Sequence, residues 1–332
     1  MEDLVTLTPS GLYVEAGGFY LDPWEPVDQA VISHAHADHA RPGNKRYLCT
    51  AASAPLLRHR LGEQAQVEGL AYGERLRIGR VIVSLHPAGH ILGSAQVRIE
   101  EAGRVLVFTG DYKRAADPTC AELEVLKCDT LVSEATFALP IYRWDQTSAV
   151  IGQIWEWWRA NREQGRASVL FCYALGKAQR ILAELSRLTD QPVFAHGAID
   201  QLADLYRQNG ARLLPTQRAS EMPSGHDFAG ELILAPPTSR ATPWLRRFGD
   251  CAIAFASGWM RIRGERRRQG FDRGFALSDH ADWPALLDTI RDTGAQSVRL
   301  THGHAPTLAH FLSEQGVDAR ALEASFNEEA ED

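Results

Sequence analysis

The stretch His34-Ala35-His36-Ala37-Asp38-His39 decides how the rest of this 332-residue chain is interpreted. It places four side chains able to bind metal ions within six residues, and the alanines between them keep the loop slim. Neutral imidazole and carboxylate are the usual ligands of zinc and similar divalent ions. The preceding residues, Gln29-Ala30-Val31-Ile32-Ser33, read as a short buried strand. We therefore expect a metal-binding turn at a strand end. A polar surface loop or an expression tag is the alternative, and the internal position after a strand disfavours a tag.

Length and composition narrow the class of protein. A chain of this length forms one large or two medium domains with an ample core. Hydrophobic residues make up 45% and charged residues 23%, as in ordinary globular proteins. The formal net charge is −7. A strongly basic protein is excluded, so any binding of nucleic acid requires a local positive patch.

Cysteine usage and the sequence ends bear on the compartment. The five cysteines lie far apart and form no CxxC pair, which favours reduced thiols. The start, Met1-Glu2-Asp3-Leu4, lacks the apolar core of a signal peptide. No apolar run approaches the roughly 18 residues needed to span a membrane. We expect a cytoplasmic protein without a membrane contact and with an acidic tail at 326–332.

Further candidate site residues follow other expected strands. They are His90 after 81–85, Asp111 after 104–108, Glu134 after 130–132 and His302 after 297–301. Loops at strand ends commonly carry catalytic groups. Each residue alone is weak evidence, but the repeated arrangement is informative. Asp22, at the end of an expected hairpin over residues 12–21, is either a turn former or a hydrogen-bond partner of a metal-bound histidine.

These residues can be assembled into a site for two divalent ions. His34, His36 and His90 supply three nitrogens for one ion. Asp38, His39 and His302 supply ligands for the second ion. Asp111 is the carboxylate that bridges the two ions. Two ions about 3.5–4 Å apart can acidify one water and neutralise a phosphate oxygen. Asp38 is counted among the catalytic residues as well as the ligands.

Hydrolysis at neutral pH also needs a proton for the leaving oxygen. His280 has the chemistry for this role, and Glu134 can orient it and keep it protonated. The alternatives are a helix-capping region around His280 and a plain strand-end acid at Glu134.

Strands and helices alternate from about residue 145, which predicts a second, smaller α/β unit. Lys177, after Gly176 at a helix start, is a candidate phosphate contact, as are Ser257 and Gly258. Residues 240–273 contain nine arginines against three acidic residues. Arginine suits phosphate oxygens, so Arg266 and Arg267 are expected to contact a nucleic-acid backbone. A solvated surface is the alternative.

The ordered motifs resemble a known family. Asp22, the 34–39 stretch, His90 and Asp111 look like the metallo-β-lactamase fold. Glu134 in Ser-Glu-Ala-Thr-Phe, His280 in Ser-Asp-His-Ala-Asp and His302 in Thr-His-Gly-His look like the added motifs of β-CASP nucleases. The resemblance implies an α/β protein: an αββα sandwich, residues 1–140 and 276–325, with an inserted β-CASP α/β cap at 141–275. It also implies two zinc ions, with manganese as the alternative, and phosphodiester hydrolysis.

Within this family, Ser-Glu-Ala-Thr-Phe and the short chain are most similar to the bacterial ligase-associated DNA exonucleases. The resemblance implies 5′-to-3′ degradation of DNA in repair, with a DNA ligase and a helicase as partners. His302 departs from the eukaryotic DNA branch and matches the RNA-processing branch, so a β-CASP ribonuclease acting on RNA is the alternative. A small-molecule metallo-hydrolase would need neither the inserted unit nor His280, and an inactive scaffold subunit would typically have lost ligands.

Overall fold

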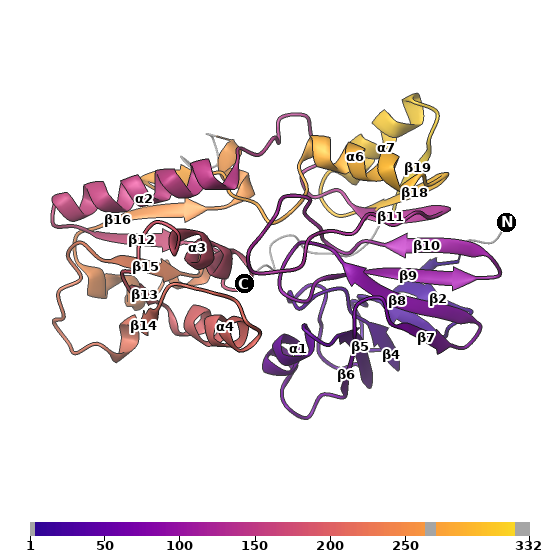
Figure 1. The fold of residues 1–332 in the computed structure, drawn as a ribbon, viewed down its shortest axis with the longest axis horizontal. Helices are drawn as coiled ribbons and strands as arrows, with labels where there is room; N and C mark the ends of the chain where they lie inside the picture. Colours follow the sequence, from indigo (N-terminus) through magenta and orange to yellow (C-terminus); the bar gives the residue numbers. More distant parts are fainter. Residues whose placement is uncertain (1–3, 263–269, 323–332) are drawn as a thin grey trace. The chain divides into compact units, whose positions relative to one another are not determined.

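The computed structural model describes residues 4–262 and 270–322. These residues form two compact units, whose elements are labelled in Figure 1. The first unit runs to Arg143 and resumes at His280, and the second comprises Trp144–Asp279. The interrupted first unit carries every residue expected to bind metal.

The first sheet of the first unit comes from the start of the chain and has the strand order β1-β2-β3-β4-β5-β6. Its strands are β1 (Thr6–Thr8), β2 (Gly11–Val14), β3 (Phe19–Leu21), β4 (Gln29–Val31), β5 (Arg46–Thr50) and β6 (Val67–Leu70). β2 and β3 form the expected antiparallel hairpin. β4 pairs in parallel with both β3 and β5. The histidine-rich turn therefore begins just past the carboxyl end of a parallel strand.

The second sheet combines strands from both ends of the chain, in the order β19-β18-β11-β10-β9-β8-β7. Its strands are β7 (Arg75–Ile78), β8 (Val81–Pro87), β9 (Ala95–Glu101), β10 (Arg104–Phe108), β11 (Thr130–Glu134), β18 (Ser297–Thr301) and β19 (Asp318–Ala321). β10, β11 and β18 are parallel neighbours, and Glu134 is in register with Thr301. Their carboxyl ends thus lie at one edge of the sheet, where the chain continues to Asp111 and His302.

Hydrophobic packing makes the first unit a layered structure. Apolar side chains of both sheets form one shared core, which includes Leu12, Phe19, Leu21, Val83, Val97 and Phe108. The other face of the second sheet packs against α6 (Trp283–Thr293) and α7 (Ala305–Glu314), which lie together beside β18 and β19 in Figure 1. On the first sheet, α1 (Ala54–Leu61) contacts β6. Burying an aliphatic side chain contributes roughly 1.5–3 kcal/mol to the free energy of folding, so these two cores supply most of the driving force for folding of the first unit.

The second unit is built around a third sheet, whose neighbouring strands are all parallel, in the order β14-β13-β15-β12-β16-β17. Its strands are β12 (Ala167–Phe171), β13 (Val193–Ala195), β14 (Thr216–Arg218), β15 (Leu232–Ala235), β16 (Cys251–Ala256) and β17 (Arg273–Phe275). Its longer helices are α2 (Thr147–Glu163), α3 (Lys177–Leu185) and α4 (Gly197–Gln208). The central strand β12 is buried along its whole length, as expected for a parallel strand covered on both faces.

The chain leaves and re-enters the first unit at adjoining points. The backbone N–H of Trp283 donates to the carbonyl of Tyr142 at 3.1 Å. The N–H of Ala281 donates to the carbonyl of Tyr112 at 2.7 Å. Both ends of the first unit's interruption are therefore fixed within that unit.

The structure confirms the mixed α/β class and differs from the sequence predictions at particular residues. It divides the chain after Arg143 and after Asp279, whereas the expected inserted domain was 141–275. Glu134 is the last residue of β11 and does not follow it. Serine before a helix commonly acts as its N-cap, but Ser53, which precedes α1, makes no side-chain cap, because its backbone is already helical at φ −81° and ψ −23°. No helix within the described ranges is both long and apolar enough to cross a membrane.

Candidate metal centre

The turn that carries the histidine motif is buried. His34 and His39 have no exposed surface, and His36 and Asp38 are 6% and 5% exposed. Polar and charged groups removed from water are destabilising unless they are paired or bind an ion. The burial of the whole turn therefore requires partners from other segments of the chain.

His34, His36 and His90, here called the three-histidine group, supply three converging ring nitrogens. Nδ1 of His36 lies 3.1 Å from Nε2 of His34 and 3.1 Å from Nε2 of His90. A tetrahedral zinc ion with metal–nitrogen distances of about 2.0–2.1 Å holds its ligand atoms about 3.3 Å apart. One proton cannot bridge three nitrogens at this spacing, whereas one ion can. Burial, together with neighbouring His39, lowers the pKa of His34 well below its usual range, so its imidazole is neutral and able to bind metal.

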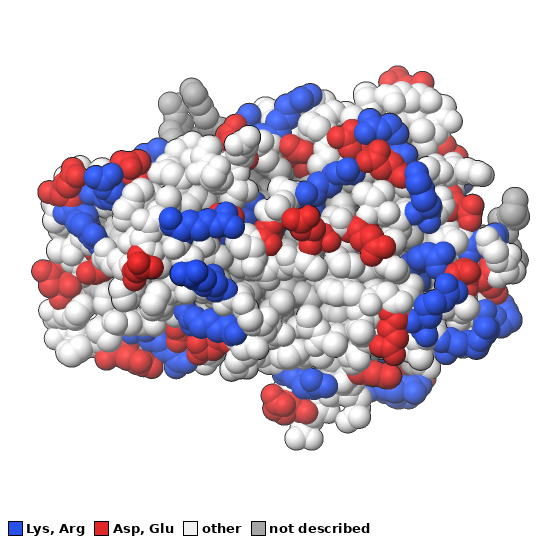
Figure 2. Space-filling view, in the orientation of Figure 1, with Lys and Arg blue, Asp and Glu red and all other residues white. Residues whose placement is uncertain are grey.

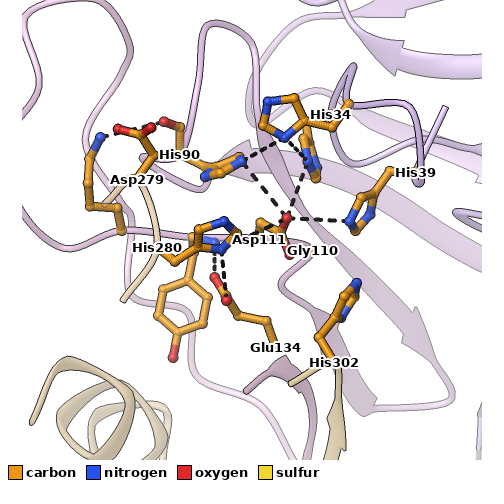
Figure 3. Close-up of polar contacts among 12 residues, drawn as sticks. His34, His39, His90, Gly110, Asp111, Glu134, Asp279, His280 and His302 are labelled. Carbon is orange, nitrogen blue, oxygen red and sulfur yellow. Dashed lines mark hydrogen bonds and ion pairs between the residues drawn. The ribbon is translucent and has the colours of Figure 1, made fainter. Parts of the chain in front are cut away.

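Asp111 follows β10 and lies at the centre of the cluster in Figure 3. Its Oδ2 is 3.4 Å from Nε2 of His34 and 3.4 Å from Nε2 of His39. Burial opposes its ionisation, but the facing His39 and His280 hold the pKa of the Asp111 carboxyl well below its usual range. The preceding Gly110 has φ 54°, and a Cβ there would come within 2.5 Å of Ser33 Cβ. The close approach that glycine permits brings Asp111 to the histidine turn.

Asp38, His39 and His302, here called the distal group, form the other side of the cluster. Each offers a ligand atom within 4.8 Å of the others. The rings of His39 and His302 stack at 5.1 Å with an interplanar angle of 11°. His302 has φ 63°, a left-handed conformation that is costly for a non-glycine residue. Burial lowers the pKa of His302 to about 4, which leaves its imidazole neutral.

Asp22 supports the distal group from behind. Its Oδ2 lies 2.7 Å from Nδ1 of His39, and its Oδ1 accepts a hydrogen bond of 2.7 Å from the backbone N–H of Ser33. The Ser33 hydroxyl also contacts Asp22 and lies 2.9 Å from Nδ1 of His34. These bonds orient both histidines so that Nε2 of each points toward Asp111. Ser33 was missed by sequence reasoning; its position between β4 and His34 was the available signal.

His280 and Glu134 form a separate pair at the edge of the cluster. Nδ1 of His280 lies 3.0 Å from Oε2 of Glu134 and 4.0 Å from Oδ2 of Asp111. The other Glu134 oxygen accepts from the backbone N–H of Tyr112 at 2.7 Å, which fixes the carboxylate. Burial raises the pKa of Glu134, although His280 opposes this. The structure thus brings together the two residues that the sequence predicted as an acid and its orienting partner.

The cluster fits divalent metal ions by its chemistry. The described residues offer overlapping sets of histidine and carboxylate atoms at ligand spacing, including the three-histidine group with Asp111 and the distal group. Oδ1 of Asp38 and Oδ1 of Asp111 are buried and have no hydrogen-bond partner among the described residues. Burial lowers the pKa of His39, yet Asp38, Asp111 and Asp22 together raise it well above its usual range. Carboxylates that hold a proton so firmly would equally hold a cation in its place.

The residues expected to contact nucleic acid have other surroundings. Lys177 is 3% exposed, and its Nζ donates to Oδ2 of Asp279 at 2.6 Å. Ser257 and Gly258 are buried, and the Ser257 hydroxyl accepts from the N–H of Trp259 at the start of a short 3-10 helix. Arg266 and Arg267 lie outside the described residues. Burial argues against direct phosphate contact by the first three, and the role of the two arginines stays a prediction.

A surface hollow of about 740 Å³ lies within the second unit. Arg166, Arg240 and Arg246 line it together with Asp272. Two of these arginines belong to the arginine-rich stretch found in the sequence. On the face shown in Figure 2, Lys and Arg side chains are interspersed with Asp and Glu side chains.

Comparison with known proteins supports the nuclease resemblance. No family model matches the chain. It is 33% identical over 318 residues to "Probable DNA ligase" of Opitutus terrae, covering 94% of this chain and 30% of that protein. It is 29% identical over 209 residues to "RNase J-like protein" of Methanocaldococcus jannaschii, covering 54% and 50%. It is 29% identical over 189 residues to "Endoribonuclease YSH1" of Gibberella zeae, covering 55% and 22%.

The chain spans half or less of each of these three relatives. A solved structure of a protein of unknown function from Enterococcus faecalis V583 superposes with a TM-score of 0.59 at 12% identity, over 90% of this chain and 78% of that one. This similarity concerns the fold alone. The nuclease names of the relatives support the class of β-CASP nucleases and a phosphodiester hydrolase, and both DNA-related and RNA-related names occur.

Proposed function

We propose that this chain is a β-CASP nuclease that degrades DNA from the 5′ end with two divalent metal ions, in DNA repair. The single observation that carries the proposal is the buried cluster in which Asp111 Oδ2 faces both the three-histidine group and the distal group. Such an arrangement suits two ions sharing one carboxylate. The imidazole-rich set favours zinc, with manganese as the alternative.

The residues would divide the work as follows. The three-histidine group would hold one ion, the distal group the other, and Asp111 both. Ions held there supply charge neutralisation at the phosphate and water acidified for attack. With Nδ1 engaged by Glu134, His280 can deliver a proton from Nε2 to the leaving oxygen. Glu134, fixed by the Tyr112 N–H, keeps the ring oriented and favours its protonated form.

DNA is favoured over RNA because the relative that spans 94% of this chain is named a probable DNA ligase. The same similarity supports a DNA ligase as a partner, and the family resemblance adds a helicase and the 5′-to-3′ direction. An RNA-processing ribonuclease is the second candidate, since the other relatives carry ribonuclease names.

The decisive test uses end-labelled single- and double-stranded DNA and RNA of one sequence, incubated with metal-loaded protein. We expect DNA to be shortened from its 5′ end, and we expect His36→Ala to lose this activity together with bound metal. Degradation of RNA alone would establish the ribonuclease instead. If neither polymer is cut, or if His36→Ala cuts as well as the parent, the nuclease proposal fails.

The arginine-lined hollow of the second unit is a described surface whose side chains suit phosphate oxygens. Replacing Arg246 by Glu should weaken DNA binding and flatten its salt dependence, because each lost phosphate contact lowers the slope of log K against log salt by about 0.9 for duplex DNA. An unchanged slope in fluorescence-anisotropy titrations would remove this surface from the proposal.

A further inference from the structure

We propose that Lys177, Arg180 and Asp279 form a buried clamp that positions His280. This proposal rests on the proposed function, in which His280 is the proton donor. The three residues are 3%, 2% and 3% exposed. Nζ of Lys177 donates to Oδ2 of Asp279 at 2.6 Å, and NH1 of Arg180 donates to Oδ1 at 2.9 Å. Each carboxylate oxygen is thus held by a different cation.

Arg180 also connects the two ends of the second unit. Its NH1 donates to the carbonyl of Ser278 at 2.7 Å, and its NH2 donates to Oγ1 of Thr147 at 2.5 Å. Thr147 is the first residue of α2, near where the chain enters this unit, and Ser278 lies just before the chain leaves it. One guanidinium therefore fixes both the entry and the exit of the unit.

His280 follows Asp279 directly and is bounded on its other side as well. The next residue, Ala281, donates its N–H to the carbonyl of Tyr112. The peptide that carries His280 is therefore held at Asp279 by the clamp and at Ala281 by a backbone hydrogen bond. These two attachments restrict the backbone at His280, so its imidazole stays beside Glu134.

Energetics favour a positioning role over a purely stabilising one. Removing charges from water costs several kcal/mol per ion, and apolar side chains of similar volume often stabilise a core at least as well. What a doubly held carboxylate provides is a defined backbone position. A shift of about 1 Å at a catalytic group can reduce the rate by roughly 100-fold, so a fixed position has a large effect on a proton donor.

The experiment compares four variants of the full chain. Asp279→Asn removes the shared carboxylate, and Lys177→Met removes one of its holders. Lys177→Arg keeps a cation at that position. Arg218→Met is the matched control, because Arg218 pairs with Asp200 at 2.7 Å elsewhere in the same unit. For each protein we measure kcat and KM on end-labelled DNA, metal content, and hydrogen exchange of the segment 277–283.

We expect Asp279→Asn to lower kcat by about 10- to 100-fold with KM changed by less than about twofold. Lys177→Met should show a smaller loss in kcat, and Lys177→Arg should recover most of it. Metal content should stay at the parent value in every variant. Exchange at the Ala281 amide should accelerate in Asp279→Asn and Lys177→Met, and remain unchanged in Arg218→Met.

Several outcomes overturn the clamp. These are an unchanged kcat in both clamp variants, an equal loss in Arg218→Met, or metal loss that parallels the loss of rate. If Asp279→Asn does not fold, Lys177→Met and Lys177→Arg decide the matter. If the parent protein degrades no nucleic acid, the proposed function fails separately, and the clamp is then judged by hydrogen exchange alone: faster exchange at Ala281 supports it and unchanged exchange rejects it.

Discussion

The three-histidine group and the distal group share Asp111 but depend on different parts of the chain. His36 and His90 are 54 residues apart, and both lie in turns next to strands of the N-terminal part of the chain. The distal group joins residues near the start of the chain to His302 near its end. It also relies on two non-glycine residues with positive φ, Asp22 at 40° and His302 at 63°. One half of the site therefore follows from nearby chain segments, while the other requires the completed fold and a strained backbone.

Loss of a three-histidine ligand should have the largest effect. We expect His90→Ala to reduce nuclease activity by more than about 100-fold, beyond the loss typical for residues that only support a ligand. Metal analysis should show fewer ions per chain. Unaltered metal content with full activity would exclude this group as a metal site.

His302→Ala tests the independence of the two groups. It should reduce the metal content from about two ions to about one per chain, because the three-histidine group keeps its own nitrogens. His310→Ala, on the exposed side of α7, is the control and should retain both ions. If His302→Ala lost metal equally from the three-histidine group and the distal group, the two groups would not bind their ions independently.

Asp22→Asn should weaken metal binding at the distal group, because His39 loses the carboxylate that orients its ring. The amide no longer accepts from His39 Nδ1 with a full charge, so metal affinity at that group should fall by about 10- to 100-fold. The three-histidine group should change far less. Asp28→Asn, which alters an exposed aspartate paired with Lys45, is the matched control in titrations with metal. A similar drop at both groups would contradict the assignment of Asp22 to one side.

Ser33→Ala should have the smallest effect on metal binding. It should affect the three-histidine group and the distal group alike, because the Ser33 hydroxyl contacts Asp22 and lies beside His34. We expect the free energy of unfolding to fall by about 1–3 kcal/mol, the cost of leaving a buried polar partner unsatisfied. Denaturant titration measures this, and Ser297→Ala, at an exposed hydrogen bond to Asp318, serves for comparison. A selective loss at one group would show that Ser33 supports only that side.

The sequence indicated the candidate ligands more readily than the residues that contact them. His34, His90, Asp111 and His302 were recognisable because each is a chemically distinctive residue next to a β-rich, apolar segment, which is a local pattern. The pairing of Glu134 with His280 spans 146 positions and was inferred from chemistry and family resemblance. The contact between Lys177 and Asp279 spans 102 positions and was missed, because its local signal, a lysine after glycine at a helix start, equally suits a phosphate.

Backbone conformation was also beyond the sequence pattern. Nothing local to Thr301-His302-Gly303 requires a positive φ at the histidine. The structure shows that a Cβ at Gly303 would come within 2.5 Å of the Thr136 carbonyl, so this turn is set by a distant segment. Similarly, Ser53 is of a residue type that often caps helices, but its backbone is helical and its side chain makes no capping hydrogen bond.

The adjoining exit and return of the first unit have a consequence for protein engineering. The Trp283 N–H bonds to the Tyr142 carbonyl, so the first unit holds together the segments on the two sides of its gap. A chain in which a linker replaces Trp144–Asp279 would keep every candidate ligand as well as His280 and Glu134, but it would lose Lys177, Arg180 and Asp279. A different insert joined at the boundary between Asp279 and His280 would therefore have to supply its own support for His280.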